Sequence, residues 1–504
     1  MKNDEVYGAS VRLKYATLIN FFSKNLSNFA SLAFVIFVTR RLSVEEFGIW
    51  TMIFKYISYV TPFVVIFSYW LPRTISRGFN TAKTGLALAM TLGSTALIIY
   101  IGIAYGASIF FNQPLFPLLL ASVLVLQEYL SNCLRSISTA HAPQYVGFSR
   151  LVLRTVQAVS GLFLVVLYRW GLYGAVLSVI VGRTCSLLLL FTINYKVIVK
   201  SKINFDVFKS WIKRSWLPLY GSFITMLFGL DAVVVRSISG SNQPIAYYGV
   251  AASLLGLMLA STRVMPALYA RLLAKRDVRD IIEAFWIAYM LNVPMVIGVL
   301  VYTEPILAVY NIKYVIASWA IRVFAFTVLI RLFTSILRTV LSGLEFRDFI
   351  NEDVNLKETV LFKVPSIDFI VTLIYLIILA VASYFFSYAS EIVVLAWGLI
   401  YCGRFLSLTI MYDKLLKKEF NIKLPYNLFL KFIAKFSIAS LGMVFIRLIC
   451  PVEPQISIFP LLQELGPIIA ISAVSYFAIL YIIDMKFRSI VKAVWSNVLS
   501  IFKR

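Results

Sequence analysis

A polar stripe runs along the first long apolar segment of the chain. Asn20, Lys24 and Asn28 stand four residues apart, which places them on one face of a helix. Side-chain amides beside an ammonium group can bind sugar hydroxyls and a phosphate. Hydrogen bonding to neighbouring helices of a bundle is the alternative use of such a stripe. The stripe is therefore a candidate binding surface with a structural role as its alternative.

Further charges lie deep inside other apolar segments. A charge at the centre of a membrane helix costs about 3 kcal/mol, so such residues mark candidate functional positions. The acids in these segments could neutralise at most half of the deep cations, and the remainder need a water-filled cavity or an anionic ligand. The deep cations are Lys24, Lys55, Arg183, Arg263, Arg331 and Arg404, and the acids are Glu128, Asp231 and Asp368.

This imbalance predicts a cavity that binds an anionic group. The predicted substrate-binding residues are Lys24, Asn20, Asn28, Lys55, Arg263 and Arg331. The candidates for ion coupling or gating are Glu128, Asp231 and Asp368. For Glu128, a plain ion pair with Arg183 is the alternative.

The sequence shows no motif for metal binding or ATP hydrolysis. His141 is the single histidine, and the four cysteines form no C-x-x-C pair and lie in or at the end of apolar segments. No P-loop is present. We therefore expect no metal, no cofactor and no enzymatic activity.

The composition indicates that lipid surrounds most of the chain. Of 504 residues, 61% are hydrophobic and 14% charged, and the mean hydropathy is +0.87. A soluble domain is closer to half apolar, and a spanning helix needs about 20 apolar residues. The fold class predicted is an all-α polytopic membrane protein with about fourteen transmembrane helices. The spans are 17–39, 47–71, 84–111, 115–139, 149–168, 171–194, 215–236, 245–270, 281–303, 317–342, 359–385, 389–412, 427–450 and 461–483.

The loops between these spans alternate in charge. If the N-terminus is cytoplasmic, the inner segments hold 32 lysines and arginines and the outer segments hold five. Positive loops stay in the cytoplasm, so both termini are predicted to be cytoplasmic in a multi-pass protein of the cytoplasmic membrane. The net charge of +24 is then an orientation signal, and we expect membrane lipids and no nucleic acid as partners. Residues 207–213 and 487–498 are amphipathic and predict interfacial helices.

An internal repeat divides the spans. Phe47-Gly48-Ile49 matches Tyr248-Gly249-Val250, and the segment beginning at Arg135 matches the one beginning at Arg338, with offsets of 201 and 203 residues. An offset of six helices preserves orientation, so the repeats are parallel. The predicted domains are 1–200 for the first six-helix bundle, 201–425 for the second, 426–484 for two extra helices and 485–504 for an amphipathic cytoplasmic tail.

The segment between the first two spans carries a family resemblance. Arg41-Leu42-Ser43, three variable residues and then Phe47-Gly48-Ile49-Trp50 resemble the corresponding loop of the polysaccharide transporter, or Wzx-like, family. That family belongs to the multidrug/oligosaccharidyl-lipid/polysaccharide (MOP) flippase superfamily. The resemblance implies two six-helix bundles that face each other across a central cavity and open alternately to either side. The small residue at Gly48 should let the second helix begin close against a neighbour.

The same resemblance implies a function. The cargo would be a polyprenol-linked oligosaccharide with a phosphate or pyrophosphate, flipped across the cytoplasmic membrane for surface glycan or glycoprotein synthesis. Glycan assembly enzymes are then candidate partners, and the extra helices would lie beside a groove for the lipid tail. Lipid II flippases, more distant relatives, resemble this chain in carrying cavity cations on helices one, two and eight, where Lys24, Lys55 and Arg263 fall.

Two alternatives remain open from the sequence. An ion-coupled drug or metabolite exporter of the same superfamily would need unpaired acids to bind cationic cargo, and the charge balance is the opposite. A polytopic glycosyltransferase or polysaccharide ligase would need acids near a large outer loop, and the predicted outer loops are short. The acidic loop 343–363 departs from the family pattern and has no assigned role.

Overall fold

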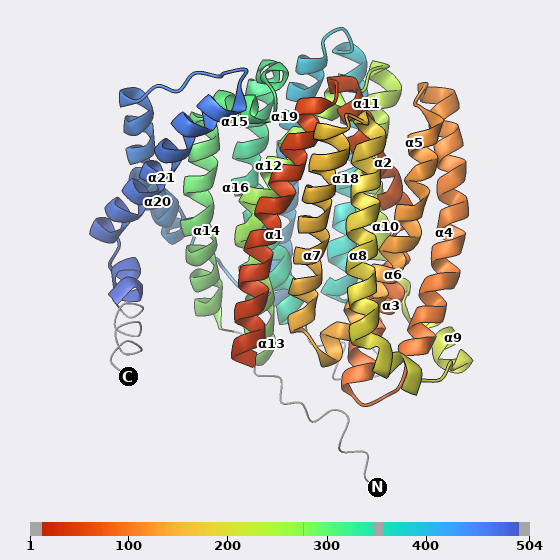
Figure 1. Ribbon diagram of the computed structural model, residues 1–504. Helices are drawn as coiled ribbons and strands as arrows, with labels where there is room; N and C mark the ends of the chain where they lie inside the picture. Colours follow the sequence, from red (N-terminus) through yellow and green to blue (C-terminus); the bar gives the residue numbers. More distant parts are fainter. Residues whose placement is uncertain (1–12, 276, 346–355, 493–504) are drawn as a thin grey trace, which may run out of the picture. The chain divides into compact units, whose positions relative to one another are not determined.

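In the computed structural model, residues 13–275, 277–345 and 356–492 are described, and every regular element within them is a helix (Figure 1). The chain divides into two compact units by its contacts. Unit 1 comprises Met1–Gly249 with Ser383–Ser390, and unit 2 comprises Val250–Ala382 with Glu391–Arg504. This division falls at Gly249, within the eighth predicted span. The predicted domain limits at 200 and 425 rest on the repeat and stay a prediction.

Unit 1 is built around α7, which packs between α1 and α8, with α6 against α3, α4 and α8 (Figure 1). Short connections join consecutive helices of this unit. They are α1 (Leu13–Arg41), α2 (Val44–Val60), α3 (Val64–Ser76), α4 (Ala82–Phe111), α5 (Leu115–Leu120), α6 (Ser122–His141), α7 (Gln144–Gly161), η1 (Leu162–Leu167), α8 (Gly171–Lys200), α9 (Phe205–Arg214), α10 (Trp216–Gly229), α11 (Asp231–Ser239) and the first turns of α12 (Gln243–Met258).

In unit 2, α14 packs against α16 and α20, and α20 packs against α21. Exposed apolar side chains such as Ile377 on α18 and Leu448 on α20 form outward faces suited to lipid. The remaining helices are η2 (Leu259–Val264), α13 (Met265–Lys275), α14 (Val278–Val301), α15 (Thr303–Tyr310), η3 (Ile312–Ala317), α16 (Ser318–Leu344), η4 (Leu356–Glu358), α18 (Val360–Phe385), α19 (Ser390–Phe420), α20 (Tyr426–Ile449) and α21 (Ile458–Ile483).

The described residues contain twelve helices that are long and apolar enough to cross a membrane. The chain is thus a multi-pass membrane protein. A thirteenth candidate is the pair α2 and α3, which is bent by 62° and corresponds to the second predicted span. The first predicted span corresponds to α1, a 29-residue helix whose polar stripe lowers its hydropathy. Each of the fourteen predicted spans matches a helix or a broken helix, while the count of fourteen itself stays a prediction.

The start of α2 is fixed by local chemistry and by a close helix contact. The Ser43 hydroxyl accepts from the Glu46 N–H at 3.2 Å, and the Glu46 carboxylate accepts from the Ser43 N–H at 2.8 Å, which forms a capping box. A Cβ at Gly48 would lie 2.2 Å from the Asn242 carbonyl oxygen. A Cβ at Gly249 would lie 2.5 Å from the Thr51 hydroxyl of α2. The two glycines that the repeat pairs are therefore both points of close approach between α2 and the first turns of α12.

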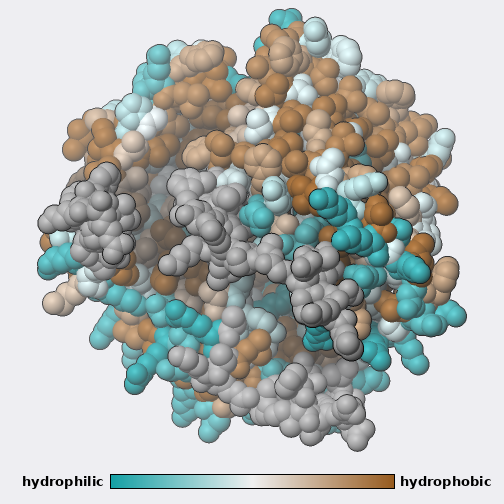
Figure 2. Space-filling model, turned by 60° about the horizontal axis from the view of Figure 1, so that its bottom comes forward, coloured by the Kyte–Doolittle hydropathy of each residue, from teal (hydrophilic) through white to brown (hydrophobic). Residues whose placement is uncertain are grey.

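Both predicted amphipathic segments contain helix. α9 buries Trp211 and exposes its basic residues, and residues 485–492 form the second helix. Val494 and Val498 lie outside the described residues. Figure 2 shows hydrophilic residues gathered at the end of the molecule turned forward, beside hydrophobic flanks. This distribution is the one expected where polar loops and interfacial helices leave the membrane.

Asp484 anchors the helix at 485–492, and its removal should loosen that helix. One carboxylate oxygen accepts from the Phe487 N–H at 2.8 Å and the other from Lys435 Nζ of α20 at 3.1 Å. Burial acts to raise the pKa of Asp484, but these two partners hold the pKa below its ordinary value. The anchor is thus complete above the ordinary carboxyl pKa of about 3.9 and is lost only as pH falls further.

We expect Asp484→Ala to weaken this helix by about 1 kcal/mol, the value of an N-cap. Hydrogen exchange of residues 485–492 should accelerate at pH 7 and at pH 5, with Asp484→Asn in between. Glu453→Ala, which removes an exposed acid, is the control. Unchanged exchange in Asp484→Ala would contradict the anchor.

Candidate functional site

The predicted site residues fall on elements of both units. Asn20, Lys24 and Asn28 lie on α1 and Lys55 on α2, in unit 1. Asn28 is half-buried, while the side chains of Asn20 and Lys24 lie outside the described part of the structure. Unit 2 carries Arg331 on α16 and Arg263 in η2, a 3-10 segment between α12 and α13. The Arg263 side chain is likewise outside the described part. That these cations line one cavity stays a prediction.

Lys55 forms a buried ion pair with Asp231. Lys55 Nζ lies 2.8 Å from Asp231 Oδ1, and the two side chains are 18% and 0% exposed. The same Oδ1 accepts from the Ala232 N–H at 2.7 Å, and Lys55 Nζ lies 5.0 Å from the centroid of the Tyr248 ring. The pair joins α2 to α11 within unit 1. Lys55 is thus one member of a buried ion pair, and its role in substrate binding stays a prediction.

Both partners lie near an interruption of their span, a 62° bend between α2 and α3 and the single residue Leu230 between α10 and α11. α2 ends at Val60 and α3 begins at Val64, while α10 ends at Gly229 and α11 begins at Asp231. Backbone groups freed by a break need new partners in a membrane. The Val60 carbonyl accepts from the Tyr129 hydroxyl at 2.6 Å, and the Gly229 carbonyl accepts from the Tyr59 hydroxyl at 2.8 Å. The two tyrosines therefore stabilise the broken helices on either side of the pair.

A polar belt joins the same helices near the turn between α11 and α12. Glu45 accepts from the Ser241 hydroxyl at 2.9 Å and from the Asn242 N–H at 3.1 Å. The Gln113 amide donates to Asn242 Oδ1 at 3.2 Å, and Arg236 donates to the Phe111 carbonyl at 2.7 Å. Glu45, in the first turn of α2, therefore links this helix to the turn between α11 and α12.

The other two predicted gating acids are also paired with arginines. Glu128 lies 2.5 Å from Arg183 Nη1 and accepts from the Asn132 amide at 2.7 Å, so the alternative of a plain ion pair is what the structure shows. In unit 2, Asp368 lies 3.5 Å from Arg338 Nη1. Roles of Glu128, Asp231 and Asp368 in ion coupling or gating stay predictions.

Arg331 lies among neutral and aromatic groups of unit 2. Its Nη1 donates to the Tyr401 hydroxyl at 2.6 Å, and its guanidinium carbon lies 5.4 Å from the centroid of the Phe405 ring. Among the described residues it forms no ion pair. Nearby, Arg404 Nη2 donates to the Thr372 hydroxyl at 3.0 Å. Of the two predicted substrate-binding cations whose side chains are described, Lys55 is therefore in an ion pair and Arg331 is not.

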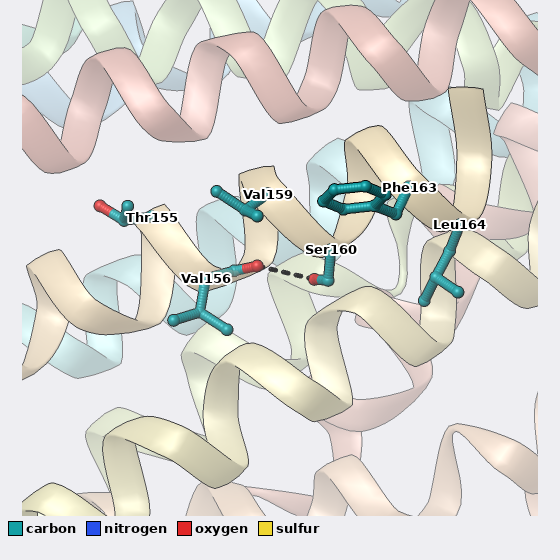
Figure 3. Close-up of a pocket in the computed structure, with 6 residues that line it drawn as sticks. All are labelled: Thr155, Val156, Val159, Ser160, Phe163 and Leu164. Atoms are coloured by element: carbon teal, nitrogen blue, oxygen red, sulfur yellow. Dashed lines mark hydrogen bonds between the residues drawn. The ribbon is translucent and has the colours of Figure 1, made fainter. Parts of the chain in front are cut away.

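The sequence did not point to the tyrosines at the breaks or to a cavity on α7. Aromatic residues are so frequent in membrane proteins that Tyr59, Tyr129 and Tyr248 carry no distinguishing signal. The cavity, of about 400 Å³, holds none of the predicted site residues. Figure 3 shows the hydroxyl of Ser160 donating to the Val156 carbonyl, at 2.7 Å, in its wall. The lining is Thr155, Val156, Val159, Ser160, Phe163 and Leu164.

Cysteines and acidic residues give no metal site in the described residues, where no group of three or more ligating side chains is close enough to hold an ion. Cys133 is buried, and Cys450 is exposed at the end of α20. In the acidic loop, Glu345 Oε2 accepts from the Val360 N–H at 2.8 Å and so caps α18. Asp348, Glu352 and Asp353 lie outside the described residues.

No model of a protein family matches the sequence, and no curated protein matches it. Solved structures do match. A lipid II flippase, MurJ, in an inward closed conformation covers 95% of this chain and 100% of its own, with a TM-score of 0.59 and 16% identity.

An inward-facing multidrug resistance transporter of the MATE family covers 80% of this chain and 99% of its own, with a TM-score of 0.60 and 12% identity. A MOP-superfamily transporter from Pyrococcus furiosus, described by a reversed polarity of its binding pocket, covers 81% and 95%, with a TM-score of 0.53 and 15% identity. The chain therefore has the fold of the MOP-superfamily transporters, which is the fold that the resemblance implied.

Proposed function

We propose that this protein, which has the transporter fold of the MOP superfamily, flips a lipid-linked oligosaccharide across the cytoplasmic membrane by alternating access. The cargo would carry a polyprenol phosphate or pyrophosphate. Both termini would be cytoplasmic, as the charge of the loops predicts. The observation that carries the proposal is the excess of positive charge within the membrane spans.

The ion pairs of the deep acids are consistent with an excess of positive charge, because the acids are all engaged while cations remain. Each of the three deep acids has an arginine or lysine partner, so none is left as an open site for a cation. Arg331 has hydrogen-bonding and aromatic neighbours, and Lys24 and Arg263 add two further positive charges to α1 and η2. Charged groups in a membrane need water or an opposite charge. A phosphate-bearing headgroup would supply that opposite charge. It would contact these cationic residues as it crosses the membrane.

The extent of the structural matches also supports a flippase. The lipid II flippase covers 95% of this chain, whereas the MATE transporter covers 80%. The difference is about 76 residues, the length of two spanning helices such as α20 and α21 together with their connecting segments. We infer that α20 and α21 would serve the long lipid tail of the cargo, which then never has to enter water.

A drug or metabolite exporter is the second candidate because MATE transporters share the fold. Such a protein would bind cationic cargo through unpaired acids. The pairing of Asp231 with Lys55 and of Glu128 with Arg183 argues against that use. The pocket polarity reported for the Pyrococcus furiosus transporter offers a precedent for relating pocket charge to function within the superfamily.

Replacing Lys24 and Arg263 together by glutamine should make the lipid-linked glycan accumulate on the cytoplasmic side. The expected slowing is at least about tenfold, since each lost charged contact is worth about 1.5–3 kcal/mol. Flipping would be measured in vesicles by the access of a sugar-specific probe to each leaflet. Lys196→Gln with Lys200→Gln removes the same charge at the exposed end of α8 and should leave flipping unchanged.

Two outcomes would overturn the proposal. One is intact glycan export after deletion of the protein in cells without a redundant flippase. The other is purified protein that moves small organic cations and does not move the lipid-linked glycan.

A further inference from the structure

A cluster of arginines lies between α6, α7 and α8 of unit 1. Arg135 comes from α6, Arg150 and Arg154 come from α7, and Arg183 comes from α8. The charge of Arg154 interacts with those of the other three arginines and with that of Glu128. The three helices thus bring a group of like charges close together. Such a group repels itself unless something neutralises it.

The four arginines lie at increasing depth along their helices, and we call this series the arginine ladder. α6 ends and α7 begins at one turn, and the short loop after η1 brings α8 back toward the same end. At 1.5 Å per residue, Arg135 and Arg150 lie about 9 Å from this end and Arg154 about 15 Å. Arg183 lies about 26 Å from Lys200, which is past the middle of α8. The loop charges predict that the ladder starts at the cytoplasmic side.

Glu128 is the one acid that the described structure places against these arginines, and it is held at the top of the ladder. It pairs with Arg183 and accepts from Asn132. Below it, Arg135 donates to the Ser131 carbonyl at 3.0 Å and Arg154 donates to the Gln157 amide oxygen at 3.0 Å. Both partners are neutral, so three positive charges of the four are not balanced by this acid.

The arginines are also within reach of a ligand. Arg135 and Arg154 are half-buried, Arg150 is exposed, and Arg183 and Glu128 keep 15% and 27% of their side chains exposed. Arginine guanidinium groups that are partly withdrawn from water bind phosphate through paired hydrogen bonds. We infer that Arg135, Arg154 and Arg183 form a phosphate-binding site within unit 1, with Arg150 at its entrance. Its residues are distinct from Lys24, Lys55, Arg263 and Arg331, and the inference does not rest on the proposed flippase function.

Glu128 gives the site a testable property. A phosphate entering from Arg150 meets Arg135 and Arg154 first, while Glu128 competes with it for Arg183. Removing the competing charge should therefore strengthen binding, whereas removing Arg135 and Arg154 should weaken it. A cluster with a purely structural role would lose stability in both variants and would gain affinity in neither.

The test uses the full-length protein in two arms. In detergent, isothermal titration calorimetry measures inorganic phosphate and pyrophosphate. In nanodiscs, native mass spectrometry compares retention of dioleoylphosphatidic acid with that of dioleoylphosphatidylcholine. We expect Arg135→Gln with Arg154→Gln to lower the affinity about tenfold or more, since about one charged hydrogen bond or more is lost. We expect Glu128→Gln to raise the affinity several-fold, because Arg183 is then free to bind the phosphate. Lys196→Gln with Lys200→Gln is the control of equal charge.

The two arms identify the source of the phosphate. Binding of the inorganic anions indicates a soluble ligand or free headgroup, and selective retention of phosphatidic acid alone indicates a lipid headgroup. Arg135→Lys with Arg154→Lys keeps the charge but loses the paired hydrogen bonds, so it should bind less tightly than the native protein, and it replaces the glutamine variant if that variant fails to fold. The inference is overturned if neither ligand binds, if binding survives in the glutamine double variant, or if Glu128→Gln fails to raise it.

Discussion

Replacing Lys55 with glutamine should lower the free energy of unfolding by about 3–5 kcal/mol, the cost of leaving one charge of a buried pair without its partner. Asp231 is fully buried and its Oδ1 lies 2.8 Å from Lys55 Nζ. Without the ammonium group, Asp231 would retain the Ala232 N–H, at 2.7 Å, for the same oxygen. Because the pair bridges two broken helices, the loss should also loosen α2 against α11.

The matching replacement of Asp231 by asparagine should cost a similar amount, and the double replacement should cost less than either single one. In the double variant no charge is left buried. Unfolding in mixed detergent micelles, followed by circular dichroism, gives the four free energies of the cycle. Lys196→Gln is the control at an exposed position. Additive losses in the double variant would show that the two charges do not stabilise each other.

Gly48→Ala should destabilise the protein by about 3 kcal/mol, near the upper end for added bulk in a packed site. The new methyl group would lie 2.2 Å from the Asn242 carbonyl oxygen and 2.9 Å from its carbonyl carbon. Backbone atoms cannot rotate away, so α2 or the start of α12 would have to shift. The shift would also strain the bonds from Glu45 to Ser241 and Asn242.

Two other glycines make this test selective. In α4, no atom lies within 4 Å of the position that a Cβ at Gly102 would take, so Gly102→Ala should be neutral or stabilising by up to about 1 kcal/mol. Gly249→Ala meets the side chains of Thr51 and Phe47, and Thr51→Ala should partly rescue it. Thermal unfolding in detergent measures all of these variants. A Gly48→Ala protein as stable as Gly102→Ala would refute the close approach.

The arrangement along the chain follows from the sequence because local composition controls insertion into lipid. Apolar runs such as 84–111 and 171–194 match α4 and α8 because a segment of that length must satisfy its backbone hydrogen bonds within a helix. Helix α2 begins at Val44, three residues before the predicted span, because Ser43 and Glu46 form a capping box that the sequence analysis did not predict. The close approach at Gly48 could be expected because only glycine lacks a side chain there.

The partners of the deep charges could not be read from the sequence. Lys55 and Asp231 are 176 residues apart, and Glu128 and Arg183 come from α6 and α8. Hydropathy places each charge at a depth but says nothing of which helices pack together or how each helix is rotated. The breaks at Val60 and Gly229 also lay inside runs that looked continuous, because the tyrosine hydroxyls that stabilise them come from distant segments.

The sequence by itself determined the membrane class, the helix positions, the superfamily resemblance and the excess of deep positive charge. Those properties depend on composition and on contacts between near neighbours. Only the tertiary structure decided that Lys55 is paired, that Glu45 clamps the α11–α12 turn, and that four arginines of α6, α7 and α8 form one cluster. Such properties depend on side chains brought together from distant segments, and coulombic interaction is strong only at those short distances in a medium of low dielectric constant.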